Sequence, residues 1–440
     1  MRVSFRNICV LSCFVIGYYA QKAESSNRVS TELVGVYNDS LKFLFQNFNH
    51  PDINFGIVIA SPSKSYPDYF YHWTRDAALT QDSLYQVYKA TQDIALKEQI
   101  LTQARAWIRA EIDIQEKSLT APAGIAEPKY YVSGYAYDYP WARPQDDGPA
   151  TRSVSIMQWA QVLTSLGEGD YVRNTLFRPE LPARSIIKRD LEYVAHNWRQ
   201  ASFDLWEEIK GTHFFTRALQ LKALRMGAVF ANEWGDPEAA LFYAQEANSI
   251  AAEMGRFINH DRTYLLETLD WAGGWNHKTS NLDIAIILAA NQALFQEAFF
   301  KDNLDVFMST LNLLEQKFKD LYTINKNNPD MAAALGRYPE DVYTGITTEG
   351  PANPWFIATH GAAEFYCKLA EAFKKSGNQE KSTEFLQKGL KYFERTLLHR
   401  NQETGEMSEQ FSRENGFLVG ASHLTWSYAS YLTAYLACAQ

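Results

Sequence analysis

Residues 236–255 read DPEAALFYAQEANSIAAEMG and form the clearest helical segment of this 440-residue sequence. Asp236 suits the N-cap, Pro237 the first turn and Gly255 the position that ends the helix. The apolar side chains that recur every three or four residues are Ala240, Tyr243, Ala247, Ile250 and Met254. This spacing places them on one face, so the segment is predicted to be an amphipathic helix that packs on one side.

The same periodicity recurs along the chain and predicts about twelve such helices. They lie near residues 29–48, 76–91, 93–116, 150–167, 184–200, 214–234, 237–255, 281–299, 301–321, 360–376, 379–398 and 425–437. Convincing strands are absent from the pattern. The connections that follow every second helix, starting with the first, are long and rich in aromatic and charged residues, whereas most of the others are short.

In consecutive antiparallel helix pairs, such long connections emerge at the same end. No sequence repeat of fixed period is visible, which disfavours an open array of repeats. We therefore expect an all-α fold, an (α/α)6 barrel in which six helical hairpins close into a ring. The long loops should gather on one rim and form a pocket there.

The composition favours a globular protein with a neutral ligand. Hydrophobic residues make up 46% of the chain and aromatic residues 14%, including 11 Trp and 25 Tyr. Trp and Tyr suit stacking on sugars, although a Tyr-rich core would give the same count. The net charge is −9 and the basic residues are scattered, so neither a nucleic acid nor an anionic membrane is an expected partner.

The first residues have the pattern of a secretory signal peptide. A basic start is followed by an uncharged, mostly apolar run over 8–20 that is too short to span a membrane. We expect a signal peptide over 1–24, cleaved between 20 and 26, and a single catalytic domain over 27–440; a retained anchor is the alternative. Asn38 begins a glycosylation sequon. Cys367 and Cys438 remain after cleavage, and the sequence leaves their pairing open.

Glutamates in the long loops are candidates for glycosidic bond cleavage, which needs one protonated and one ionised carboxyl. Glu207 and Glu208 follow Trp206 and are predicted to lie just ahead of a helix, so either can supply the protonated carboxyl. The apolar ring of Trp206 would raise the pKa of such a carboxyl by desolvation. Glu409 lies far away in sequence but on the same rim if the ring closes. By local sequence alone, glutamates before a helix are more often part of a solvated first turn.

Seven loop motifs occur in an order that resembles glycoside hydrolase family 15, the glucoamylases. They are DYFYHWTRD at 68–76, WARPQDDGP at 141–149, DLWEE at 204–208, GRYPED at 336–341, NPWF at 353–356, MSEQ at 407–410 and LTWSY at 424–428. The resemblance, to fungal and yeast members without a starch-binding domain, runs from about residue 30 to the C-terminus. It implies an (α/α)6 barrel that releases β-glucose, with inversion, from the non-reducing ends of α-1,4-glucans such as starch and glycogen.

The resemblance also assigns roles to residues. Glu207 would be the general acid and Glu409 the general base that activates water. The implied substrate-binding and supporting residues are Tyr69, Trp73, Arg75, Asp76, Tyr137, Trp141, Asp204, Glu208, Arg337 and Trp426. Among these, Arg75 and Asp76 would grip the terminal glucose, and Asp204 would support the acid. The chain departs from the family at Gly420, where some members have a hydroxyl that steadies the base, and at residues 421–423, which read ASH instead of ARD.

Other chemistries lack their motifs, so no cofactor and no metal are expected. The expected partner is an α-glucan or malto-oligosaccharide, with no nucleic acid and, after signal removal, no membrane. We expect a monomer in the secretory pathway that ends outside the cell, in the cell wall or in a vacuole. Two alternatives stay open: a hydrolase of another α-glucoside such as trehalose or isomaltose, and a non-catalytic glucan-binding module. The presence of both Glu207 and Glu409 argues against the second.

Overall fold

The computed structural model of this protein describes residues 31–439. The signal peptide expected over 1–24 lies outside the described residues and stays a prediction. Along residues 31–439, no helix is both long enough and apolar enough to cross a bilayer.

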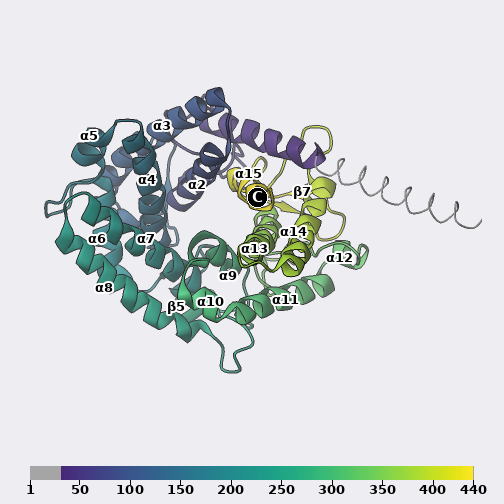
Figure 1. The fold of residues 1–440 in the computed structure, drawn as a ribbon. Helices are drawn as coiled ribbons and strands as arrows, with labels where there is room; N and C mark the ends of the chain where they lie inside the picture. Colours follow the sequence, from purple (N-terminus) through teal and green to yellow (C-terminus); the bar gives the residue numbers. More distant parts are fainter. Residues whose placement is uncertain (1–30, 440) are drawn as a thin grey trace, which may run out of the picture.

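Two concentric rings of helices make up the fold (Figure 1). The inner ring contains α2 (Thr74–Ala90), α4 (Asp147–Ser165), α7 (Phe214–Glu233), α9 (Ala285–Ala289), α13 (Phe356–Lys375) and α15 (Thr425–Cys438). The outer ring contains a helix over residues 31–48, α3 (Ile94–Ser118), α6 (Ile186–Asn197), α8 (Pro237–Glu253), α11 (Leu304–Leu321) and α14 (Gln379–His399). Outer and inner helices alternate along the chain, which confirms the predicted (α/α)6 barrel.

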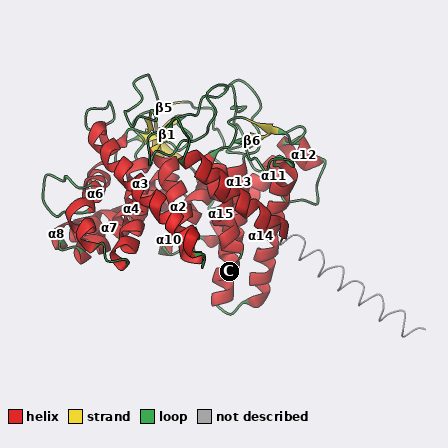
Figure 2. Cartoon of the chain, turned by 90° about the horizontal axis from the view of Figure 1, so that it is seen from above, coloured by secondary structure: helices red, strands yellow, loops and turns green. Residues whose placement is uncertain are grey.

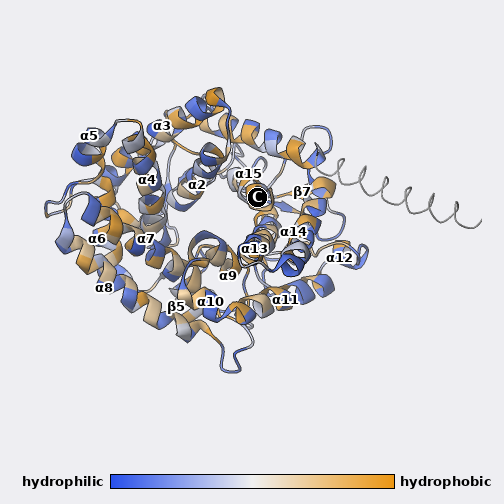
Figure 3. Ribbon diagram, viewed as in Figure 1, coloured by the Kyte–Doolittle hydropathy of each residue, from blue (hydrophilic) through white to orange (hydrophobic). Residues whose placement is uncertain are grey.

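The two rings differ in how their residues are buried. The outer helix α14 buries a single stripe that includes Phe385, Gly389 and Tyr392, as expected for a helix with one face in water. The inner helix α4 buries residues on every side, because it is enclosed by neighbours. Hydrophilic and hydrophobic residues accordingly alternate around the outer helices (Figure 3).

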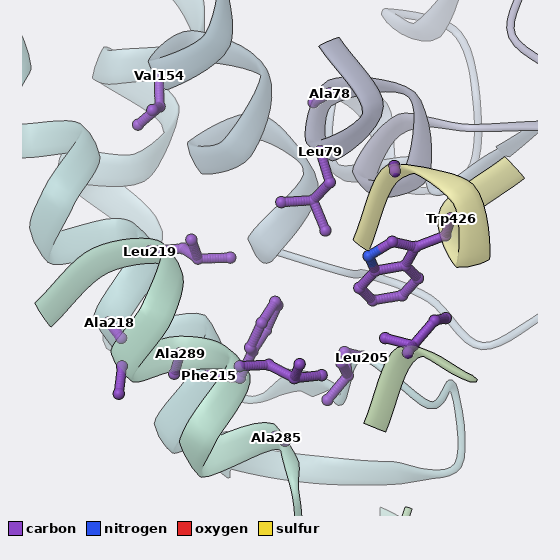
Figure 4. Close-up of a cluster of buried hydrophobic side chains, with 14 of the residues drawn as sticks. Ala78, Leu79, Val154, Leu205, Phe215, Ala218, Leu219, Ala285, Ala289 and Trp426 are labelled. Carbon is purple, nitrogen blue, oxygen red and sulfur yellow. The ribbon is translucent and has the colours of Figure 1, made fainter. Parts of the chain in front are cut away.

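Side chains from the inner helices fill the centre of the ring. Leu79 of α2, Phe215 and Leu219 of α7, Ala289 of α9 and Trp426 of α15 belong to one buried cluster (Figure 4). The ring is therefore a packed core and not a channel, and a pocket on the rim has a floor.

The long loops lie on one face of the ring (Figure 2). They contain the strands β1 (His72–Trp73), β2 (Lys129–Tyr130), β3 (Ser202–Phe203), β4 (Ile209–His213), β5 (Thr268–Gly274), β6 (Gln410–Phe411) and β7 (Leu418–Val419). The pairs β1–β2 and β6–β7 and the sheet β3–β4–β5 are antiparallel. The expectation that strands are absent was wrong, because strands of two to seven residues are too short to give a clear alternating pattern.

The ring helices begin within four residues of the predicted positions, and two of them differ from the prediction in how they continue. The Asp236 carboxylate accepts the Ala239 N–H at 3.1 Å, which confirms the predicted N-cap. The helix continues past Glu253 as a 3₁₀ turn, η3 (Met254–Phe257), instead of stopping at Gly255.

The helix predicted over 281–299 is broken into three parts. Asp283 accepts the N–H of Ala285 at 2.9 Å, so α9 begins there. It continues as a π-helical turn, η4 (Ala290–Leu294), before the short α10 (Ala298–Asp302). The remaining short elements are η1 (Gly124–Ala126), α5 (Gly169–Tyr171), η2 (Val172–Leu176) and α12 (Thr323–Lys326).

A disulfide joins Cys367 of α13 to Cys438 at the end of α15. This is the pairing that the sequence left open. It fixes the last helix to its inner-ring neighbour.

Candidate active site

A pocket of about 330 Å³ lies among the rim loops. Its lining includes ten of the predicted site residues: Tyr69, Trp73, Arg75, Asp76, Trp141, Glu207, Glu208, Arg337, Glu409 and Trp426. The ring closure thus brings together residues that are more than three hundred positions apart. Tyr137 and Asp204 do not line the pocket; Tyr137 lies edge-on against the outer side of Trp141, with 5.6 Å between ring centroids.

A tight turn positions Glu207. Its backbone is in the left-handed region, with φ at 66°, and its N–H donates to the Asp204 carbonyl at 2.9 Å. The buried Asp204 carboxylate accepts the backbone N–H groups of Glu208 at 2.7 Å and Ile209 at 2.9 Å. Asp204 therefore supports the turn that presents Glu207. The turn leads into β4 and not directly into a helix, which corrects the expectation from sequence.

Three N–H donors converge on the Glu207 carboxylate. Oε1 accepts from Trp73 Nε1 at 2.8 Å and from Gln145 Nε2 at 2.9 Å. Oε2 accepts from Trp141 Nε1 at 2.9 Å. Burial raises the pKa of Glu207, although the nearby Arg75 guanidinium, 3.6 Å from Oε1, lowers it. The carboxyl is thus oriented firmly and favoured in its protonated form relative to an exposed glutamate.

Arg75 and Asp76 lie next to each other at the start of α2. Arg75 Nη1 donates to Asp147 at 2.8 Å and to the Gln145 side-chain oxygen at 2.9 Å. Burial raises the pKa of Asp76 to about 6, although Arg75 lowers it. A neighbouring donor and acceptor of this kind can bind vicinal hydroxyls of a sugar.

A second ion-pair cluster, centred on Arg337, also lines the pocket. Arg337 Nη2 is 2.7 Å from Glu208 Oε1 and 2.6 Å from Asp341 Oδ1. Burial raises the pKa of Glu208 to about 7, although Arg337 lowers it. Asp341 holds the guanidinium through its Nε as well, at 2.8 Å, so the fork is fixed before any ligand arrives.

Glu409 lies immediately before β6 and lines the same pocket. Its N–H donates to the Ala421 carbonyl at 2.8 Å, which ties it to the strand end beyond β7. Oε2 accepts from the Gln410 side chain at 3.3 Å, while the buried Oε1 has no hydrogen-bond partner among the described residues. Burial raises the pKa of Glu409 to about 8, although the hydroxyl of Tyr69, Arg337 and the hydroxyl of Tyr343 lower it.

Aromatic rings form most of the remaining wall. Sequence reasoning found Trp73, Trp141 and Trp426, and the structure adds Trp275, Tyr343 and Trp355. Trp355 lies within the NPWF motif already noted. The sequence gives no specific indication of Trp275 and Tyr343, because they lie in long loops that contain many other aromatic residues.

Two further expectations concern surface and metal chemistry. Asn38 is exposed on the first outer helix, so a sugar chain has room there. Within residues 31–439, no group of three or more His, Cys, Asp and Glu side chains could hold a metal ion.

Two buried carboxyls face one aromatic pocket that an Arg–Asp pair lines, on a double ring of helices. Fold and site together define an (α/α)6-barrel glycoside hydrolase. The chain matches the model of glycosyl hydrolases family 15 over residues 38–436 and belongs to that family.

Known relatives align with nearly the whole chain. A glucoamylase of Blastobotrys adeninivorans is 34% identical and aligns with 94% of this chain and 73% of its own length. A probable glucoamylase of Schizosaccharomyces pombe is 32% identical, with 87% and 85% covered. The solved glucoamylase of Saccharomycopsis fibuligera superposes with a TM-score of 0.80 at 29% identity, covering 93% of this chain and 95% of that one.

Proposed function

We propose that Glu207 is the general acid and Glu409 the general base with which this exo-acting hydrolase releases β-glucose from the non-reducing ends of α-1,4-glucans. The observation that carries the proposal is the pair of buried carboxyls from distant segments that line one pocket. A single displacement by water at C1 inverts the anomeric configuration.

The hydrogen bonds of Glu207 indicate which oxygen donates the proton. A carboxylate oxygen has two lone pairs, and those of Oε1 already accept from Trp73 and Gln145. Oε2 accepts only from Trp141, so it has one position left for a proton. Glu207 Oε2–H therefore donates to the glycosidic oxygen while the bond from that oxygen to C1 breaks.

Glu409 completes the reaction from the other side. Glu409 lines the same pocket, and its ionised carboxylate accepts a proton from a water bound there. The water oxygen bonds to C1, and its proton passes to Glu409. Glu207 ends ionised and Glu409 protonated, so proton exchange with solvent restores the enzyme for the next cycle.

The other pocket residues bind and orient the terminal glucose. Arg75 and Asp76 take hydroxyls of that residue, and Glu208 and Arg337 take hydroxyls around the scissile bond. Trp73, Trp141, Tyr69 and Trp426 provide apolar surfaces for the sugar faces. Tyr137 and Asp204, which lie behind the lining, support Trp141 and the Glu207 turn respectively.

Three substrates separate the proposal from its alternatives. Proton NMR follows the anomers released from maltotriose, glycogen and trehalose. Early β-glucose from maltotriose and glycogen supports the proposal. Turnover confined to trehalose would identify another α-glucosidase, and binding without turnover would identify a non-catalytic glucan-binding module.

Carboxamide variants test the two roles. Glu207→Gln and Glu409→Gln should each lower kcat on maltose by about 10²–10⁴-fold with little change in ligand affinity, because each carboxyl acts in the transition state. Glu238→Gln, which changes an exposed carboxylate at the start of α8, is the matched control and should leave kcat unchanged. Wild-type turnover in Glu207→Gln or Glu409→Gln would remove that residue from its role.

We also propose that the chain is a single catalytic domain over 27–440 that works as a secreted, glycosylated monomer modified at Asn38. The family and the exposure of Asn38 support this reading. Expression in a eukaryotic host should give a product whose mass falls after glycosidase treatment, and Asn38→Gln should abolish that change. Light scattering on the purified protein measures its oligomeric state, and a dimer mass would contradict the monomer.

A further inference from the structure

A buried lysine lies directly behind the two indoles that hold Glu207. Lys129 is only 3% exposed. It is the residue of β2 that pairs with Trp73 of β1 in the antiparallel ladder. The strand pairing therefore fixes the lysine beside the acid, although the two are far apart in sequence.

Four aromatic rings surround the Lys129 ammonium. Its Nζ lies 3.6 Å from the ring centroid of Trp141, 4.0 Å from that of Tyr71, 4.2 Å from that of Tyr137 and 4.7 Å from that of Trp73. The Lys129 ammonium has no hydrogen bond and no ion pair with the described residues, so the ring faces are its close partners. Each such contact contributes about 0.5–2 kcal/mol, with the higher values for desolvated cations.

The same two tryptophans connect this cage to the catalytic carboxyl. Trp73 donates its N–H to one oxygen of Glu207 and Trp141 donates its N–H to the other. A cation on the face of an indole polarises the ring, which makes its N–H a stronger donor to an anion. The ammonium also attracts the ionised carboxylate through space.

We propose that Lys129 is a positioning residue for the acid step: its ammonium orients the Trp73 and Trp141 N–H groups onto Glu207 and favours the ionised carboxylate. The proposal rests on the assigned role of Glu207 as the acid. A buried acid that held its proton too tightly would release it poorly to the leaving oxygen. Lys129 opposes that effect of burial.

Charged groups from several elements act on Glu207 and Lys129. Arg75 and Asp76 face Glu207 from α2, and Lys129 faces it from β2. Glu207, Asp68 and Arg143 are the charged groups that act on Lys129. Burial lowers the pKa of Lys129 to about 8, although Glu207 and Asp68 raise it, so the ammonium is charged throughout acidic and neutral pH.

The decisive experiment compares pH profiles of kcat/KM for Lys129→Met, Lys129→Arg and Lys117→Met. Methionine fills the space between the four rings without a charge, so no cation then favours the ionised form of Glu207. The basic limb of the pH profile should therefore move up by about 0.5–1 pH unit. Arginine keeps the charge and should keep the limb. Lys117 is a matched control, since it lies 4.3 Å from the Tyr135 ring outside the pocket and its removal should shift nothing.

A second readout uses the leaving group. Fluoride needs less protonation than an alcohol, so Lys129→Met should lose about tenfold in kcat on maltose and clearly less on α-glucosyl fluoride. Three results would each overturn the proposal. The first is a basic limb of the pH profile that does not move in Lys129→Met, and the second is an equal loss of kcat on both substrates. The third is a shift of the basic limb in Lys129→Arg as large as that in Lys129→Met. If Lys129→Met does not fold, the pH profile of Lys129→Arg still tests the proposal. A shifted basic limb in a variant that keeps the positive charge would contradict it. Wild-type activity in Glu207→Gln would instead remove the acid role itself, which is a distinguishable failure.

Discussion

Gly420 lies against the carboxylate of Glu409: a Cβ at position 420 would be 2.5 Å from Oε2. Gly420 also has φ at 76°, in the left-handed region that favours glycine. Gly420→Ala should therefore push the Glu409 carboxylate out of place and lower kcat about tenfold or more, with a smaller change in KM.

The control for this variant is Gly377→Ala. Gly377 has a similar φ of 80°, but a Cβ there would meet nothing within 4 Å. Both variants should lose about 1–2 kcal/mol of stability from backbone strain, and only Gly420→Ala should lose turnover. Equal kcat values in the two variants would contradict the contact.

The pH dependence of catalysis should be displaced toward neutral pH. Burial raises the pKa of both Glu207 and Glu409, the latter to about 8, above the ordinary glutamate value of about 4.3. The base must be ionised, so activity falls as pH falls through the range in which Glu409 takes up its proton. We expect kcat/KM on maltose to rise as the pH increases from 4 toward 8, the range over which Glu409 ionises. Full activity at pH 4 would contradict this. The acidic and basic limbs of the pH profile report apparent pKa values of the Glu207–Glu409 pair and not of either residue alone.

Gln145 connects the sugar-binding arginine to the acid. Arg75 can only donate, so it fixes the Gln145 oxygen toward itself and the Gln145 amide nitrogen toward Glu207. Gln145→Leu should lower kcat about tenfold to a hundredfold, because Glu207 loses a donor and Arg75 an acceptor. Gln103→Leu removes another buried amide, which donates to Asn49 away from the pocket, and should affect stability but not kcat.

The disulfide between Cys367 and Cys438 should stabilise the fold without affecting the chemistry. The cysteines are separated by 71 positions, and closing a loop of this size restricts the unfolded chain by about 4 kcal/mol at most. Replacement of both by serine should lower the free energy of unfolding by about 2–4 kcal/mol in urea titrations, with unchanged kcat at 25 °C. Full stability in the double variant would contradict the expectation.

The sequence predicted the helices better than the loops. Helical periodicity located all twelve ring helices, because most of them have several turns of apolar residues at helical spacing. The strands were not predicted, because β1 and β2 have two residues each and their pairing depends on contacts between distant loops. The late start of α9 depends on the hydrogen bond from the Ala285 N–H to Asp283, and its early end on a π-helical turn, and no apolar pattern reveals either.

The site divides in the same way. Residues within dense loop motifs, such as Arg75 and Glu207, were found from sequence. The positions of Asp204 and Tyr137 behind the lining could not be predicted, because a motif does not show which way a side chain points. Lys129 gave no signal at all, since its importance comes from the rings that the ladder of β1 and β2 places around it.

Ring closure has a consequence for how activity is acquired. The N–H of Thr425 at the start of α15 donates to the Ala60 carbonyl at 2.8 Å, and Asn47 reaches the Thr425 hydroxyl across 378 positions of sequence. Contacts of such high order form late, after the nearer hairpins. Glu207 and Glu409 come from opposite halves of the chain, so a partly folded molecule does not bring the two carboxyls into one pocket. Regain of turnover on refolding should therefore coincide with the docking of the last helix, which makes enzymatic activity a measure of complete topology.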